Sequence, residues 1–166
     1  MSLELLPVWT ELSIRNHFLA DSKIKDYKSW SVGDSEWPMI FGGIYKEIPR
    51  VNHMELRFDG PFVNEVSRGI FDIETEINIL VTAFQNETSS IKISQATGIL
   101  LGAFSTIQIK KYTGDESVVG CLKLKNKVPP TKGDRLEIRR FQQIDKDQPI
   151  EQAIVEGHFM AQIELE

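Results

Sequence analysis

The chain has 166 residues, of which 41% are hydrophobic and 26% charged, and this size and balance are typical of one soluble globular domain. Its 24 acidic and 19 basic residues give a formal charge of −5, which argues against a general DNA or RNA clamp because such a protein needs a basic surface. One cysteine excludes a disulfide framework within the chain and a Cys-rich zinc site, and no stretch approaches the roughly 18 apolar residues of a membrane span.

The N-terminal segment is predicted to be a helix over residues 1–20. Apolar residues recur there at three- and four-residue steps, and Pro7 lies in the first turn, where its missing N–H costs little. The early Glu4 and Glu11 are unlike a secretory signal, so we expect an intracellular protein. Residues 21–50 are predicted to form a loop or arm, in which 38–45 are compatible with a short strand.

From residue 51 the hydrophobic period changes to two. Residues 51–58 and 62–67 are predicted strands, with a break at Asp59-Gly60-Pro61. Residues 69–84 fit both a helix and a strand, but they are rich in β-branched side chains, which lose rotamer freedom in a helix and pack well on a sheet. We therefore predict a long strand there, with the acidic residues Asp72, Glu74 and Glu76 on one face.

A second helix is predicted over residues 88–104. Thr88, Ser89 and Ser90 are candidate N-caps, and the apolar stripe is expected to include Ile91. Gly98 and Gly102 lie four apart in this helix, where each costs roughly 1 kcal/mol relative to Ala. We explain both glycines by close packing of the helix on a sheet or a neighbour.

The rest of the chain is predicted to be strands at about 106–112, 118–125, 135–144 and 150–165, the first two joined by a hairpin turn at 113–116. In the last strand, Glu151, Gln152, Glu156 and His158 are expected to face away from the alternating apolar residues. The sum is a single α+β domain over 1–166: a mainly antiparallel sheet with one or two helices packed on one face and long projecting strands. Projecting strand edges invite pairing with other chains.

Few residues suggest metal or nucleophilic chemistry. His17, His53 and His158 could join Glu55, Glu156 or Asp59 around a metal, but no pair has the His-Glu-x-x-His spacing, so we expect surface or edge histidines. Cys121 lies in an apolar strand and is expected to be a small core residue. Asp145 and Asp147 lack the rest of a calcium loop and are expected in a polar turn. We predict no metal and no cofactor.

The paired carboxylates allow two interpretations. Glu74 and Glu76 point the same way from one strand, and with His158 they could form an acid–base site if they converged in a cavity. A solvated strand face is the simpler interpretation. In a ring, the same row could line an acidic lumen.

Basic residues gather over 106–140 although the whole chain is acidic. Aromatic interleaving of the kind that binds single strands is missing there. A solvated face, a contact between subunits and a phosphate-backbone contact remain open. The basic residues are Lys110, Lys111, Lys123, Lys125, Lys127, Lys132, Arg135, Arg139 and Arg140.

The C-terminal part has a pattern that resembles the end of small virion proteins of tailed bacteriophages. Phe141 to Asp145 reads Phe-Gln-Gln-Ile-Asp, and Gln152 to Phe159 reads Gln-Ala-Ile-Val-Glu-Gly-His-Phe. The middle of the chain also resembles that group, in MELRFDGPFVNEVSRGIFDIETEINILVTAF and in the helix with GILLGAF, so the likeness covers roughly residues 50–165. The element order is similar to that of tail terminator proteins, with the hairpin region at about 106–140 added.

The resemblance implies a non-enzymatic structural protein of the virion, assembled in the host cytoplasm. Tail terminators form a hexameric ring that caps the tail tube and joins it to the neck, with a lumen that passes DNA without specific binding. We therefore expect a homo-oligomeric ring with neck and tail-tube proteins as partners and no membrane contact. The alternative is a capsid decoration protein or another tail or neck assembly protein. The residues expected at the interface or lumen are Asp72, Glu74, Glu76, Lys110, Lys111, Arg139 and Arg140.

Overall fold

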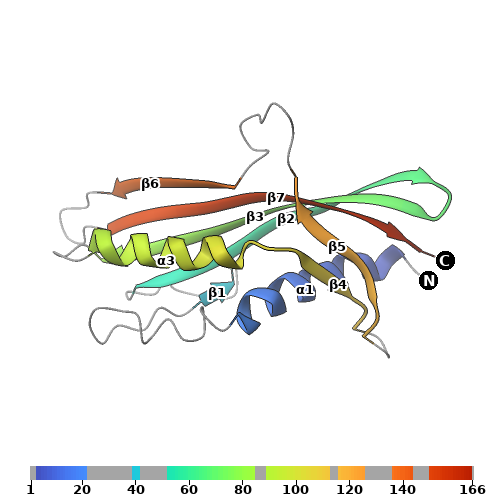
Figure 1. Ribbon diagram of the computed structural model, residues 1–166, viewed down its shortest axis with the longest axis horizontal. Helices are drawn as coiled ribbons and strands as arrows, with labels where there is room; N and C mark the ends of the chain where they lie inside the picture. Colours follow the sequence, from blue (N-terminus) through green and yellow to red (C-terminus); the bar gives the residue numbers. More distant parts are fainter. Residues whose placement is uncertain are drawn as a thin grey trace.

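A curled sheet with two helices on one face forms the body of the molecule, which confirms the predicted α+β class (Figure 1). The computed structural model describes residues 3–21, 39–41, 52–84, 89–112, 116–125, 136–143 and 150–165. Within these residues the sheet has seven strands. Six follow the order β1 (Met39–Phe41), β2 (His53–Ser67), β3 (Ile70–Phe84), β7 (Ile150–Glu164), β5 (Val118–Leu124) and β4 (Ile107–Lys110), and β6 (Glu137–Gln143) pairs with β7 off this path. Neighbouring strands run antiparallel except β1 and β2, which are parallel.

The N-terminal helix forms as predicted. A single 3-10 turn, η1 (Leu3–Leu5), leads into α1 (Leu6–Ala20), and Pro7 lies at the helix start. The short strand β1 (Met39–Phe41) lies within the predicted loop or arm and pairs with β2. Apart from β1 and Asp21, the segment 21–50 lies outside the described residues.

Three strands of 15 residues each dominate the sheet: β2 (His53–Ser67), β3 (Ile70–Phe84) and β7 (Ile150–Glu164). β3 is a strand over its whole length, as its β-branched composition predicted, and its odd-numbered residues from Ile73 onward are buried. It pairs with β7 from one end to the other, with Ile70 opposite Glu164 and Phe84 opposite Ile150.

The predicted break at Asp59-Gly60-Pro61 is wrong, because β2 runs straight through these residues. Gly60 has a φ of +106°, which favours glycine, and the register with β3 shifts between Asp59 and Phe62. The strand therefore absorbs a turn-like sequence as a bulge and continues to Ser67.

The remaining elements are α3 (Ser89–Ala103), β4 (Ile107–Lys110), β5 (Val118–Leu124) and β6 (Glu137–Gln143). β4 and β5 form the predicted hairpin. Two strands share the second edge of β7: β6 pairs with residues Ile150 to Glu156, and β5 pairs with Phe159 and Met160. This arrangement brings the basic strands β5 and β6 beside the acidic β3–β7 pair.

The core lies between the sheet and the helices. A chain of rings crosses it, with centroids 5.3 Å apart for Phe18 and Phe104 and 5.9 Å apart for Phe104 and Phe159. A Cβ on Gly157 would lie only 3.0 Å from the Phe104 ring, so this glycine leaves room for the ring against β7. The buried residues of the two helices include Leu6, Trp9, Ile14, Phe18, Ile93, Ala96, Leu100 and Ala103.

Two expectations about side-chain direction are wrong. Ile91 is 58% exposed, and a Cβ on Gly98 or Gly102 would meet nothing within 4 Å, so these three residues lie on the outer side of α3 and not in a close contact. Glu151 points toward the helices with 6% of its surface exposed, because Arg140 pairs with it on that face at 2.7 Å.

Candidate functional site

The acidic row lies on the face of the sheet that is turned away from the helices. Asp72, Glu74 and Glu76 alternate along β3 with the buried residues that face α1 and α3, so all three project from the opposite face, as predicted. In register, β7 places Gln162, Met160 and His158 beside them. The sheet thus combines acidic and imidazole groups on one surface.

Two carboxylates of this row have hydrogen-bond partners within the chain. Lys125 Nζ donates to Glu74 Oε1 at 2.8 Å, and Gln162 Nε2 donates to Asp72 Oδ1 at 3.1 Å. The sequence left open whether the basic stretch meets the acidic row across subunits. The Lys125–Glu74 pair joins the two within one subunit.

Glu76, Glu156 and His158 form a compact group that we call the Glu–His cluster. Their ligand atoms all lie within 4.8 Å of one another, and His158 Nε2 is 3.8 Å from Glu76 Oε1. The pKa of the Glu76 carboxyl is raised above its usual value, first because it shares a hydrogen bond with Glu156 and second because burial disfavours its charge. His158 acts in the opposite direction on this pKa.

Arg139 and Asn78 border the cluster. Arg139 Nη2 donates to Glu156 Oε2 at 2.6 Å, so one oxygen of that carboxylate already has a cation. Asn78 lies directly opposite Glu156 in the register and hydrogen-bonds the Glu76 carboxylate through its side chain. The Asn78 Oδ1 atom is buried and has no hydrogen-bond partner among the described groups.

Arg140 lies on the opposite face from Arg139, because neighbouring residues of a strand alternate. Its guanidinium donates to Glu151 Oε1 at 2.7 Å and to the hydroxyls of Ser90 and Ser94 on α3. Arg140 therefore joins β6, β7 and the start of α3.

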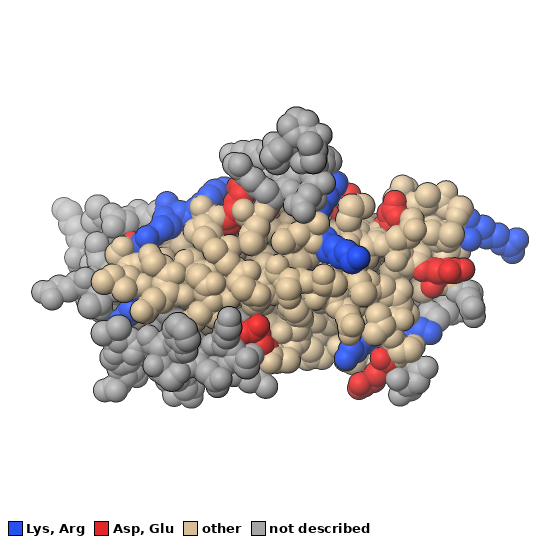
Figure 2. Space-filling model, viewed as in Figure 1, with Lys and Arg blue, Asp and Glu red and all other residues tan. Residues whose placement is uncertain are grey.

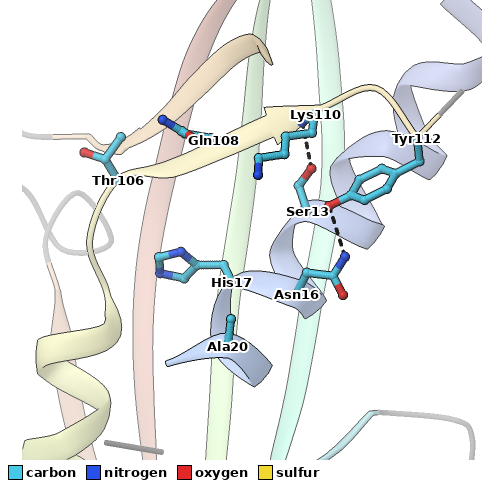
Figure 3. A pocket seen from close by; sticks show the side chains of 8 residues that line it. All are labelled: Ser13, Asn16, His17, Ala20, Thr106, Gln108, Lys110 and Tyr112. Atoms are coloured by element: carbon cyan, nitrogen blue, oxygen red, sulfur yellow. Dashed lines mark hydrogen bonds between the residues drawn. The ribbon is translucent and has the colours of Figure 1, made fainter. Parts of the chain in front are cut away.

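A pocket of about 390 Å³ lies between α1 and β4 (Figure 3). Lys110 donates its backbone N–H to Ser13 Oγ at 3.0 Å, and Asn16 Nδ2 donates to Tyr112 Oη at 3.0 Å. His17 Nε2 contacts the Ala103 carbonyl at 2.8 Å. These hydrogen bonds hold α1 against β4 and the end of α3, so the polar groups of the pocket have a structural role. Lys111 is the residue after β4, and it donates its backbone N–H to the Ser117 carbonyl oxygen.

The other candidates from the sequence are dispersed. His53 is buried, which contradicts the expected surface or edge histidine, whereas His17 is partly exposed and lines the pocket. Cys121 is half-buried and carries a free thiol. Asp145 and Asp147 lie outside the described residues. Of the three histidines, His158 alone enters a cluster of metal-ligating groups in the described part of the chain.

The sequence did not reveal Glu156 as a partner of Glu76. The alternation of β7 placed Glu156 and His158 on one face, and that of β3 did the same for Glu74 and Glu76. The sequence did not give the register between the two strands, in which Glu76 lies opposite His158 and Asn78 opposite Glu156. That pairing joins segments about 80 residues apart, and no local pattern encodes it.

The end of the β2–β3 hairpin projects beyond the helices (Figure 1). We call residues 61–72 the arm; this segment is distinct from residues 21–50, which were predicted to be a loop or arm. Phe62 is 57% and Val66 53% exposed there, and Val63 is exposed as well. Within the described residues, β2 pairs with β1 only at 54–56, so the arm has an edge that faces no strand.

A second exposed surface lies at the other end of the molecule. Figure 2 shows few charged side chains over α3, the helix far from the arm in Figure 1. We call its outer residues the α3 surface: Ile91, Ser94, Gly98, Leu101 and Gly102. Exposed apolar groups that gather at one place are typical of surfaces that contact other chains, and the arm gathers three of them.

Comparison with protein-family models and with curated proteins finds no match to this chain. Among the described residues, no helix has the length and apolar character needed to cross a membrane. The phage resemblance of the sequence therefore remains a prediction.

Proposed function

We propose that the protein is a structural component of a tailed-phage virion that acts at the head–tail junction as a tail terminator-like ring. The assembly part of this proposal rests on one observation: a single subunit has two exposed apolar surfaces, the arm and the α3 surface, at its opposite ends. The resemblance of the sequence to phage virion proteins carries the assignment to the junction.

Two different surfaces at opposite ends suit a head-to-tail contact. A head-to-tail interface generates a closed ring when its rotation closes, and a ring leaves no subunit with an open end. In this arrangement, the arm of one subunit packs on the α3 surface of the next. The apolar side chains of Phe62 and Val66 supply the contact.

The face turned away from the helices suits the lumen of such a ring. Acidic groups outnumber basic ones on it, and a negative wall repels the phosphates of passing DNA and keeps it from binding. In the described residues, this face bears Asp59, Asp72, Glu74, Glu76, Glu137, Glu156 and Glu164, against Arg57, Lys123, Lys125 and Arg139.

The ring contact is tested by one charge introduced into each surface. We expect Val66→Lys in the arm and Ile91→Lys on α3 each to reduce the oligomer to monomers, because a buried lysine without a partner is costly. Val118→Lys is the matched control, since Val118 is 48% exposed on β5, outside both surfaces. Sedimentation velocity gives the fraction of each species.

Oligomers that survive both substitutions as well as they survive Val118→Lys would overturn the head-to-tail contact. A wild-type trimer, or a wild-type monomer found on capsids, would instead favour the decoration protein. The assignment to the junction is tested separately, by labelling virions with antibody against the protein and locating the label by electron microscopy.

A further inference from the structure

The Glu–His cluster has the composition of a metal site. Two carboxylates and one imidazole converge from adjacent strands, with their ligand atoms within 4.8 Å of one another. The β3–β7 pairing fixes their backbones, since Glu76 lies directly opposite His158 and Glu156 is two residues before His158 on the same face. A rigid sheet therefore presents three ligands that need only side-chain rotation to close on an ion.

We propose that Glu76, Glu156 and His158 bind a divalent transition-metal ion, with Zn²⁺ preferred over Mg²⁺ and Ca²⁺. Zinc takes carboxylate oxygen and imidazole nitrogen at about 2.0–2.2 Å, which places its ligands roughly 3.3 Å apart in a tetrahedron. Mg²⁺ and Ca²⁺ favour all-oxygen surroundings, so the imidazole selects against them. The fourth position faces solvent.

Asn78 borders the cluster and adds a polar atom to it. Its Oδ1 atom is buried without a hydrogen-bond partner among the described groups, although its side chain contacts Glu76. Asn78 lies on the same sheet face as the cluster and opposite Glu156 in the register, so this carbonyl oxygen is available to accept a hydrogen bond from a water on a bound ion.

Arg139 competes with the ion for Glu156. Its guanidinium holds Glu156 Oε2 at 2.6 Å, in a pair whose Arg139 side chain is half exposed. Exposed pairs of this kind are weak, so the ion can displace the guanidinium or share the carboxylate with it. Removal of this competitor should therefore strengthen metal binding.

The test is calorimetric titration of the tag-free full chain with ZnCl₂. We expect one ion per chain, with affinity lowered at least about tenfold by Glu76→Gln and by His158→Gln. Asp72→Asn is the control, because it removes one negative charge from the same strand face without changing the cluster. Arg139→Gln is expected to raise the affinity about two- to fivefold, the worth of an exposed pair.

Cobalt supplies a spectroscopic check. Co²⁺ in the site should give visible absorption bands that His158→Gln removes, and excess MgCl₂ should not displace it. The four substituted side chains, Asp72, Glu76, Arg139 and His158, are all at least partly exposed, so we expect each variant to fold. Circular dichroism of each variant without metal checks this. The absence of saturable zinc binding, or equal affinity in Glu76→Gln, His158→Gln and Asp72→Asn, would overturn the proposal. The result does not depend on whether the protein forms a ring.

Discussion

Glu76 and Glu156 place two carboxyl groups side by side on an open sheet face. Two such groups share a proton more readily than they both ionise, so the pKa of Glu76 is raised. His158 and the Asn78 amide favour the charged form and offset part of this effect. Asp59 from β2, Glu137 and Arg139 from β6 and Lys125 beyond β5 also border this region.

The raised pKa has a definite consequence for stability. Between the pKa of unfolded glutamate, about 4.3, and the higher folded pKa, the native state binds more protons than the unfolded state. The free energy of unfolding therefore falls as the pH rises through this window. In EDTA, Glu76→Gln should match the wild type in stability near pH 4 and exceed it at pH 7, as measured by urea unfolding at each pH. A constant difference across this range would contradict the proton-sharing pair.

At the scale of single residues, the sequence predicts faces better than partners. Alternation placed Asp72, Glu74 and Glu76 together correctly, because the period of a strand is a local property. The contacts of Glu74 with Lys125 and of Glu76 with Glu156 depend on strand register, which the whole fold determines. The sequence therefore predicted the row of acidic side chains on one face but not the residues that contact them.

Among the elements, β2 and α3 show where local rules mislead. Asp-Gly-Pro is a strong turn signal, but here β2 continues, because Gly60 adopts a positive φ within a bulge and both flanking segments stay paired with β3. In α3, glycine at a four-residue spacing suggested a packed face, whereas Gly98 and Gly102 lie toward solvent. Their lack of a Cβ leaves the α3 surface flat.

Substitution by alanine should have opposite effects at Gly60 in β2 and at Gly98 in α3. Gly60→Ala should lower the free energy of unfolding by about 1–3 kcal/mol, because its backbone is strained for alanine. Its Cβ would also lie 2.8 Å from the Glu74 carbonyl oxygen. In the monomeric Val66→Lys background, Gly98→Ala should raise this free energy by about 0.5–1 kcal/mol, because alanine favours the helix and meets no neighbour within 4 Å in the subunit.

Thermal or urea unfolding of both variants provides the measurement. A stabilising Gly60→Ala would mean that β2 does not pass through a bulge at this point. In the monomeric background, a destabilising Gly98→Ala would contradict the exposed position of Gly98 on α3.

For the whole molecule, composition and period were sufficient to predict the class and most elements. The long strands follow from β-branched alternation, and the helices from apolar periods of three and four. The curl of the sheet, with β5 and β6 sharing one edge of β7, could not be predicted, because it arises from pairing between distant segments. The arm and the α3 surface lie at opposite ends of the resulting molecule.

The central claim is that copies of this chain close into a ring, and the solution mass tests it most directly. Light scattering after size exclusion should give a mass near six times 18.9 kDa. The mass should be the same at low and high salt, because Glu74, Glu151 and Glu156 have their basic partners within the subunit and the proposed contact is apolar. A monomer at both salt concentrations would contradict a ring that forms on its own.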